Sequence, residues 1–182
     1  MQHFFFPDNT VFVNFAWVDR LDLLQSYLAG RGRITEAVKF EVERSKSHVA
    51  NLHKLDVSAW FDDVIEFDDT KDVDGIDFIR RRRFGGSELE PLKHLGESQT
   101  IWALTTIPAY ASSCIVTDDE AAYNLAKGQD CRVAHTIDVL RHLVAYGEIN
   151  AQEAFEIYVA MTNAGPDGRS FLENPTSARD FM

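Results

Sequence analysis

The sequence has little of several features that would identify a class of function. It contains two cysteines, Cys114 and Cys131, without CxxC spacing, so neither a disulfide framework nor a zinc site is expected and a reducing compartment fits best. No apolar run approaches the length of a membrane span, and no basic segment precedes a hydrophobic signal core. We therefore expect a cytoplasmic protein with no membrane association.

Basic residues are also scarce, with 18 Lys and Arg against 29 Asp and Glu and a formal net charge of −11. This balance argues against a broadly basic nucleic-acid coat and against docking on an anionic membrane. It leaves nucleic acid open as a substrate, because bound cations can offset a local acidic site. The length of 182 residues and the 45% hydrophobic content indicate one globular domain with a sizeable core.

Several common α/β chemistries lack their motifs. The sequence has no GxxxxGK[ST], GxGxxG, GxSxG or HExxH segment. A phosphatase of the haloacid-dehalogenase type would need a second aspartate at Thr10. A phospho-acceptor receiver domain would need a lysine in the later part of the chain to complete its carboxylate pocket, and no lysine is suitably placed.

The order of the expected elements indicates an α/β domain. Strands are expected at 3–6, 113–117 and 131–135. Helices are expected at 10–28, 35–48, 96–104, 120–127, 136–146 and 150–163. Because strands alternate with helices, we expect a three-layer α/β/α sandwich with a mostly parallel central sheet.

We expect residues 1–165 to form a single domain, interrupted by an irregular charged excursion at about 56–90. The window 56–77 holds nine acids against one base, and four consecutive arginines follow at 80–83. Charge blocks of this kind are usually solvated or mobile. Residues 166–182, rich in Gly, Pro, Ser and Asp, are expected to form a flexible tail.

Acidic residues fall where a parallel sheet gathers functional groups. Asp8 follows the first strand, Asp118 and Asp119 follow a later one, and Glu41 and Glu97 lie on helices. Carboxylates that converge raise one another's pKa, and a divalent cation relieves the repulsion. Hard oxygen ligands select Mg²⁺ or Mn²⁺.

Each acid also has a structural alternative. Asp8 and Asp119 can cap the helices that follow them. Glu97 can complement the positive end of its helix, and Glu41 can be an ordinary exposed helix residue.

Four segments together resemble the PIN domain, from about residue 3 to about residue 160 and with 56–90 outside the pattern. They are Asp8-Asn9-Thr10, Glu41 within Val38–Val42, Gly96-Glu97 and Val116-Thr117-Asp118-Asp119. The resemblance implies an α/β/α sandwich that hydrolyses phosphodiester bonds with Mg²⁺ or Mn²⁺. Many such proteins are the toxin half of bacterial toxin–antitoxin pairs.

The resemblance also implies roles for individual residues. The catalytic acids would be Asp8, Glu41, Glu97, Asp118 and Asp119. The metal ligands among them would be Asp8, Glu97 and one or both of Asp118 and Asp119. Supporting hydrogen bonds would come from Asn9, Asn14 and Thr117. The phosphate backbone would meet Arg80, Arg81, Arg82 and Arg83, unless these pair with Asp74 and Asp77 on a solvated surface.

Two assignments depart from the family pattern or stay open. Glu43 lies two residues from Glu41, on another helix face, so the second acid is not fixed. The third acid is a glutamate where many members have aspartate.

The expected function is that of an endoribonuclease acting on single-stranded or structured RNA. The resemblance also implies that an antitoxin protein could bind the chain and that the chain could form a homodimer. The alternative hypothesis is a catalytically inactive PIN-like binding module that works through protein partners.

Overall fold

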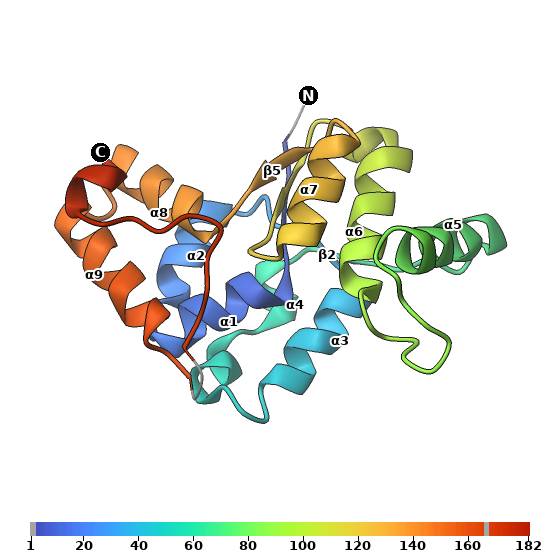
Figure 1. The fold of residues 1–182 in the computed structure, drawn as a ribbon, viewed down its shortest axis with the longest axis horizontal. Helices are drawn as coiled ribbons and strands as arrows, with labels where there is room; N and C mark the ends of the chain where they lie inside the picture. The colour runs from blue at the N-terminus through green and yellow to red at the C-terminus, as the bar shows by residue number, and fades with distance from the viewer. Residues whose placement is uncertain (1–2, 166–167) are drawn as a thin grey trace.

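The computed structural model describes residues 3–165 and 168–182, in which short parallel strands alternate with helices (Figure 1). The strands are β1 (Phe5–Pro7), β2 (Ile34–Thr35), β3 (Val64–Ile65), β4 (Cys114–Val116) and β5 (Arg132–Ala134). The α-helices are α1 (Asn9–Trp17), α2 (Leu21–Leu28), α3 (Glu36–Ser45), α4 (Val57–Trp60), α5 (Thr70–Arg82), α6 (Leu95–Thr106), α7 (Glu120–Gly128), α8 (Thr136–Ala145) and α9 (Ala151–Thr162). Single 3₁₀ turns occupy Ala50–Lys54, Pro108–Tyr110 and Ala178–Phe181. The chain is therefore mixed α/β, as expected.

The strands pair in parallel in two groups that meet at Phe5. One group has the order β1-β4-β5, and β2 pairs with β3. Phe5 donates to the Arg31 carbonyl at 2.9 Å and accepts from the Arg33 amide at 2.8 Å, and it forms a parallel bridge with Gly32. The strands consequently follow the order β3-β2-β1-β4-β5, with their carboxyl ends at one edge.

Alternate residues of the strands serve two hydrophobic clusters. Phe6, Ile115 and Val133 share a register position and face one cluster, while Val116 and Ala134 face the other. Helices α1, α2, α3, α8 and α9 pack on the second cluster, and α5, α6 and α7 pack on the first. In Figure 1 the strands run between a group with α2, α8 and α9 and a group with α5, α6 and α7.

The first expected helix is two helices. The spacing of apolar residues over 10–28 predicted one continuous helix, but α1 ends at Trp17 and α2 begins at Leu21. Asp19 between them has a φ of 56°, in the left-handed region that breaks a helix. The turn lets both helices bury the same apolar face against the core.

The expected excursion at 56–90 is in large part integrated into the fold. Val64 and Ile65 pair with β2, and α5 packs along α6 through Ile76. Most of its acids and the arginines at 81–83 lie on the outer side of this segment, whereas Arg80 is buried. Its longest irregular stretch runs from about residue 84 to α6.

The segment expected to be a flexible tail is folded over residues 168–182, while 166–167 lie outside the described residues. Phe171 and Phe181 are buried in the cluster that α8 and α9 share. The segment is polar in overall composition, but these two aromatic side chains give it enough apolar surface to pack on the core.

Cys114 and Cys131 are both free thiols. Among residues 3–165 and 168–182, no helix has the length and apolar character needed to cross a membrane.

Candidate metal centre

Asp8 lies at the carboxyl end of β1 and is 5% exposed. Its Oδ1 accepts the Asn9 amide at 2.7 Å, and its Oδ2 accepts the hydroxyls of Thr10 at 2.9 Å and Thr117 at 3.3 Å. Burial raises the pKa of Asp8 and the nearby Asp119 charge adds to it, while these hydrogen bonds act against the rise. Asp8 is thus both the helix cap considered above and a buried acid with a held orientation.

Glu41 reaches the same region from α3, at the point where α3 crosses α6. A Cβ on Gly96 would lie 3.0 Å from Glu41 Oε1, so a larger residue would push against the carboxylate, and the Gly96 amide donates to that carboxylate. Burial, with a contribution from the Asp8 charge, raises the pKa of Glu41 to about 7. The close packing of Glu41 against position 96 therefore explains why a small residue precedes Glu97.

Glu97 lies in the first turn of α6 with its side chain 14% exposed. Its Oε2 is buried and has no hydrogen-bond partner. Burial raises the pKa of Glu97 to about 8, with further contributions from Asp8, Glu41 and Asp119. An unpartnered buried carboxylate oxygen is costly, and a bound cation would satisfy it.

Asp119 completes the group from the start of α7. Its side chain caps α7 by accepting the Ala122 amide at 2.7 Å, and its own amide donates to Thr117 Oγ1 at 3.1 Å. Its charge acts on Asp8 and Glu97. We call Asp8, Glu41, Glu97 and Asp119 the acidic cluster.

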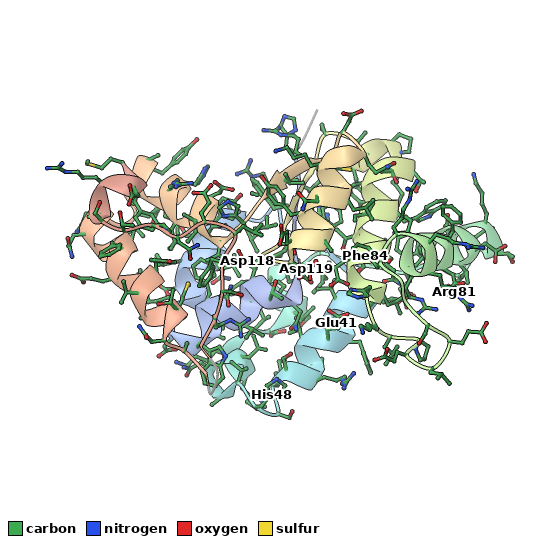
Figure 2. All side chains as sticks on the ribbon, viewed as in Figure 1. Glu41, His48, Arg81, Phe84, Asp118 and Asp119 are labelled. Carbon is green, nitrogen blue, oxygen red and sulfur yellow. The ribbon has the colours of Figure 1, made fainter. Side chains whose placement is uncertain are left out.

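Asp118 belongs to a different network. Its Oδ1 accepts the Thr136 amide at 3.0 Å, and its Oδ2 accepts the Thr136 hydroxyl and the Asn14 side-chain amide, the latter at 2.7 Å. In the view of Figure 2, Asp119 lies on the Glu41 side of Asp118. The sequence left open which of the two aspartates is the ligand, and the structure brings only Asp119 to the acidic cluster. Asn14, expected to support the site, supports Asp118 instead.

The arginine run divides into one buried and several exposed side chains. Arg80 is 4% exposed and donates to Asp77 Oδ1 at 2.8 Å and to the Ser87 and Glu90 carbonyls. Arg81 pairs with Asp77 and Glu88. Of the four arginines expected to contact phosphate, Arg80 is therefore committed to the fold, as in the alternative of pairing with Asp77. Arg82 and Arg83 are exposed.

A cleft of about 970 Å³ opens onto the acidic cluster. Asp8, Glu41 and Glu97 lie in its lining with Asn9, whose side-chain oxygen is buried without a partner. The remaining lining comes from α3, from residues 90–95, and from Thr10 and Gln99.

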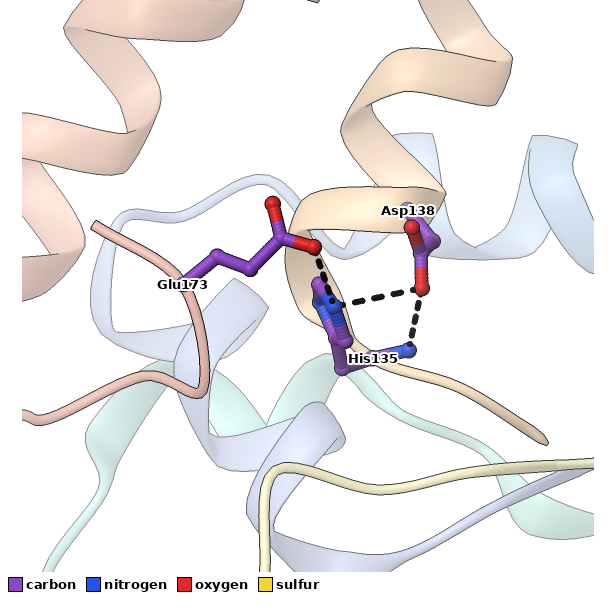
Figure 3. A group of neighbouring side chains, drawn as sticks. All are labelled: His135, Asp138 and Glu173. Atoms are coloured by element: carbon purple, nitrogen blue, oxygen red, sulfur yellow. Dashed lines mark hydrogen bonds and ion pairs between the residues drawn. The ribbon is translucent and has the colours of Figure 1, made fainter. Parts of the chain in front are cut away.

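A second group of potential ligands lies at the start of α8. His135 Nε2 is 3.3 Å from Glu173 Oε1 and 3.4 Å from Asp138 Oδ2 (Figure 3). Within the described ranges, these are the three potential ligands whose atoms all lie within 4.8 Å of one another. No spacing in the sequence signals this group, because Glu173 comes from the segment expected to be a tail.

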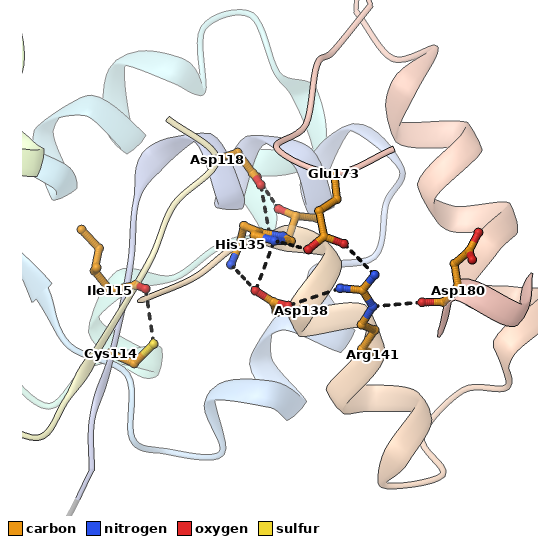
Figure 4. A network of polar contacts seen from close by, with 9 residues as sticks. Cys114, Ile115, Asp118, His135, Asp138, Arg141, Glu173 and Asp180 are labelled. Atoms are coloured by element: carbon orange, nitrogen blue, oxygen red, sulfur yellow. Dashed lines mark hydrogen bonds and ion pairs between the residues drawn. The ribbon is translucent and has the colours of Figure 1, made fainter. Parts of the chain in front are cut away.

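The second group is better suited to fixing the C-terminal segment than to holding an ion. Arg141 lies 2.6 Å from Glu173 Oε2 and 3.5 Å from Asp138 Oδ1, and it also donates to the Asp180 carbonyl (Figure 4). Both carboxylates thus already share an arginine partner. An ion on His135 Nε2 would put the ring proton on Nδ1, which is buried without an acceptor.

The donor set of the acidic cluster fits Mg²⁺ or Mn²⁺. All of its donors are carboxylate oxygens, and one of them has no partner in the described part of the chain. The carboxylate oxygens of the four acids do not all approach one another as closely as the ligand atoms of His135, Asp138 and Glu173 do. This suits Mg²⁺, which commonly keeps several waters and takes one or two carboxylates directly.

Two polar residues of the site were missed from the sequence. Thr10 binds Asp8, and its position two residues after an aspartate was a signal for that contact. Gln99 accepts the Ala37 amide at 3.0 Å and donates to Glu36 at 3.0 Å, which joins α6 to the start of α3. Nothing in its spacing pointed to that role.

Comparisons of the chain with family models, with curated proteins and with solved structures found no match.

Proposed function

We propose that this protein is a nuclease dependent on Mg²⁺ or Mn²⁺, and specifically an endoribonuclease. The observation that carries the proposal is the convergence of four carboxylates from four separate elements, with the pKa of Glu97 raised to about 8 and that of Glu41 to about 7. Groups whose pKa values are displaced by burial and by one another are typical of catalytic centres. Buried carboxylates that lie near one another disfavour ionisation, and a bound cation relieves this repulsion.

The architecture supports the same proposal. We infer a three-layer α/β/α sandwich from the two hydrophobic clusters on opposite faces of the parallel strands. The acids lie at the carboxyl ends of β1 and β4 and on helices that border this edge, where open parallel sheets place their ligands. This arrangement agrees with the PIN-like pattern in the sequence.

The residues of the cluster have distinct parts in the proposed reaction. A bound divalent ion would supply a water of lowered pKa and charge stabilisation on the phosphate. Asp8, Glu97 and Asp119 offer the ligand oxygens. Thr10 and Thr117 hold Asp8 in place, as the partners of ligating carboxylates do. Glu41, with a pKa of about 7, is able to orient the attacking water and accept its proton.

The proposal is tested by cleavage of a labelled single-stranded RNA with Mn²⁺, Mg²⁺ or EDTA. The wild type is expected to cut with either metal and not with EDTA, and both Asp8→Asn and Glu97→Gln are expected to lose cutting. Thr106→Val, on the exposed end of α6, is a control that should cut normally. If no metal supports cutting and Mn²⁺ leaves the melting temperature unchanged, the inactive binding module becomes the better account.

A further inference from the structure

The cleft beside the acidic cluster has an apolar wall that the proposed chemistry does not use. Phe40, Pro91, Leu92 and Leu95 line it together with the acids. Phe40 is 48% exposed, although exposed aromatic surface is unfavourable in water. If the acids hold a divalent cation, as proposed, an apolar wall beside them indicates a ligand with an apolar part next to an anionic part that the cation binds.

Phe40 stands on the cleft side of α3, next to Glu41 in the chain. The core side of the helix is taken by Val38 and Val42, which are buried, so Phe40 is not needed for packing there. One turn later, the Arg44 guanidinium carbon lies 5.8 Å from the centre of the Phe40 ring. An aromatic ring with a cation over one of its faces therefore lies on the same helix as Glu41.

The opposite wall is held in place by the buried Arg80. Its guanidinium donates to the Ser87 carbonyl at 3.0 Å and the Glu90 carbonyl at 3.3 Å, which fixes the loop before α6. Phe84 stacks on His94 within the same loop, with ring centres 5.1 Å apart. The cleft is therefore a formed feature of the fold.

Other charges in the cleft are already engaged. Glu36 accepts from the Gln99 amide, and Glu90 lies 3.5 Å from Lys93 Nζ. Arg44 has no ion-pair partner among the described residues, so its charge is available to a ligand in the cleft.

We propose that this cleft is a nucleobase subsite, in which one unpaired base stacks on Phe40 while Arg44 meets the adjoining backbone phosphate. The proposed subsite rests on the proposed function. It implies that the substrate is single-stranded at the cleft. Aromatic side chains stack on any base, whereas a base inside a duplex is covered on both faces. Arg44 provides a local positive charge that attracts the RNA phosphate, although the net charge of the chain is −11.

The test is the affinity of a short fluorescein-labelled single-stranded RNA, measured by anisotropy with Ca²⁺ in place of Mn²⁺. Phe40→Ala is expected to weaken binding about 5- to 150-fold, the range for loss of one base stack. Phe40→Trp should bind like the wild type, and its fluorescence should be quenched by RNA. Phe78→Ala is the matched control, because Phe78 is 56% exposed on α5 and does not line the cleft.

The outcomes separate this inference from the proposed function. If Mn²⁺ supports cutting but Phe40→Ala binds RNA like Phe78→Ala, the base subsite is wrong and the nuclease stands. A duplex of the same sequence that binds as tightly as the single strand would also overturn it. If Mn²⁺ neither binds nor supports cutting, the proposed function fails and this inference fails with it.

Discussion

Thr117 donates its hydroxyl hydrogen to Asp8 Oδ2 at 3.3 Å and accepts the Asp119 amide at 3.1 Å. One fully buried hydroxyl thus joins the carboxyl ends of β1 and β4 and sets the distance between two acids of the cluster.

This contact predicts the effect of Thr117→Val, which keeps the shape and removes the hydroxyl. Loss of a partner of a ligating carboxylate is expected to weaken Mn²⁺ binding about 10- to 100-fold. Mn²⁺ titration followed by calorimetry measures it. Affinity equal to that of Thr106→Val, an exposed threonine on α6, would show that the hydroxyl does not orient Asp8.

The two neighbouring aspartates are predicted to respond differently to the same change. Asp118→Asn places an amide among donors from Asn14 and Thr136, so it is expected to destabilise the fold by about 1–3 kcal/mol while Mn²⁺ still binds. Asp119→Asn retains a good helix cap and is expected to lose Mn²⁺ affinity with little change in stability. Thermal unfolding with and without Mn²⁺ distinguishes them, and the reverse pattern would make Asp118 the ligand.

Stability should depend on pH through Glu97. Its pKa is about 8 in the fold and near 4.5 when unfolded, so the folded state binds more protons between these values. The metal-free protein is therefore expected to lose stability as pH rises from about 5 to about 8. Glu97→Gln removes this charge, and it should raise stability at pH 8 by roughly 1–3 kcal/mol and flatten the profile. Chemical denaturation in EDTA at a series of pH values measures both, and a wild-type profile that rises with pH would contradict the raised pKa.

The arginine run should contain one structural residue among exposed ones. Arg80→Met leaves two loop carbonyls without their donor and removes one of the two arginines that pair with Asp77, and it is expected to cost about 2 kcal/mol or more. Arg82→Met, on the exposed side of α5, should change stability by less than about 0.5 kcal/mol. Urea unfolding of the two variants compares them directly, and equal costs would mean that the loop does not depend on Arg80.

Much of the fold could be predicted from the sequence because its signals are local. Thr35 caps α3, Asp119 caps α7 and Asn150 caps α9, at or within a residue of where the spacing of apolar and capping residues placed these helix starts. Strands β2 and β3 were not predicted, since a strand of two residues carries no alternation.

The site was predictable only in part. The acids could be proposed from their positions after strands, but Asp118 and Asp119 have the same chemistry and adjoin in sequence. Their directions depend on Thr136, which lies 18 residues beyond Asp118 and has no visible link to it. Burial of Arg80 likewise depends on the path of a loop that follows it.

The central claim is that the acidic cluster exchanges protons for a divalent cation, and calorimetric titration with Mn²⁺ at pH 7 tests it most directly. With the pKa of Glu97 at about 8, that carboxyl is largely protonated before the metal binds. Binding is then expected to release about one proton, seen as a heat that changes with the ionisation enthalpy of the buffer. Glu97→Gln should bind Mn²⁺ more weakly and release fewer protons than the wild type. No Mn²⁺ binding by the wild type, or binding with the same heat in every buffer, would contradict the account.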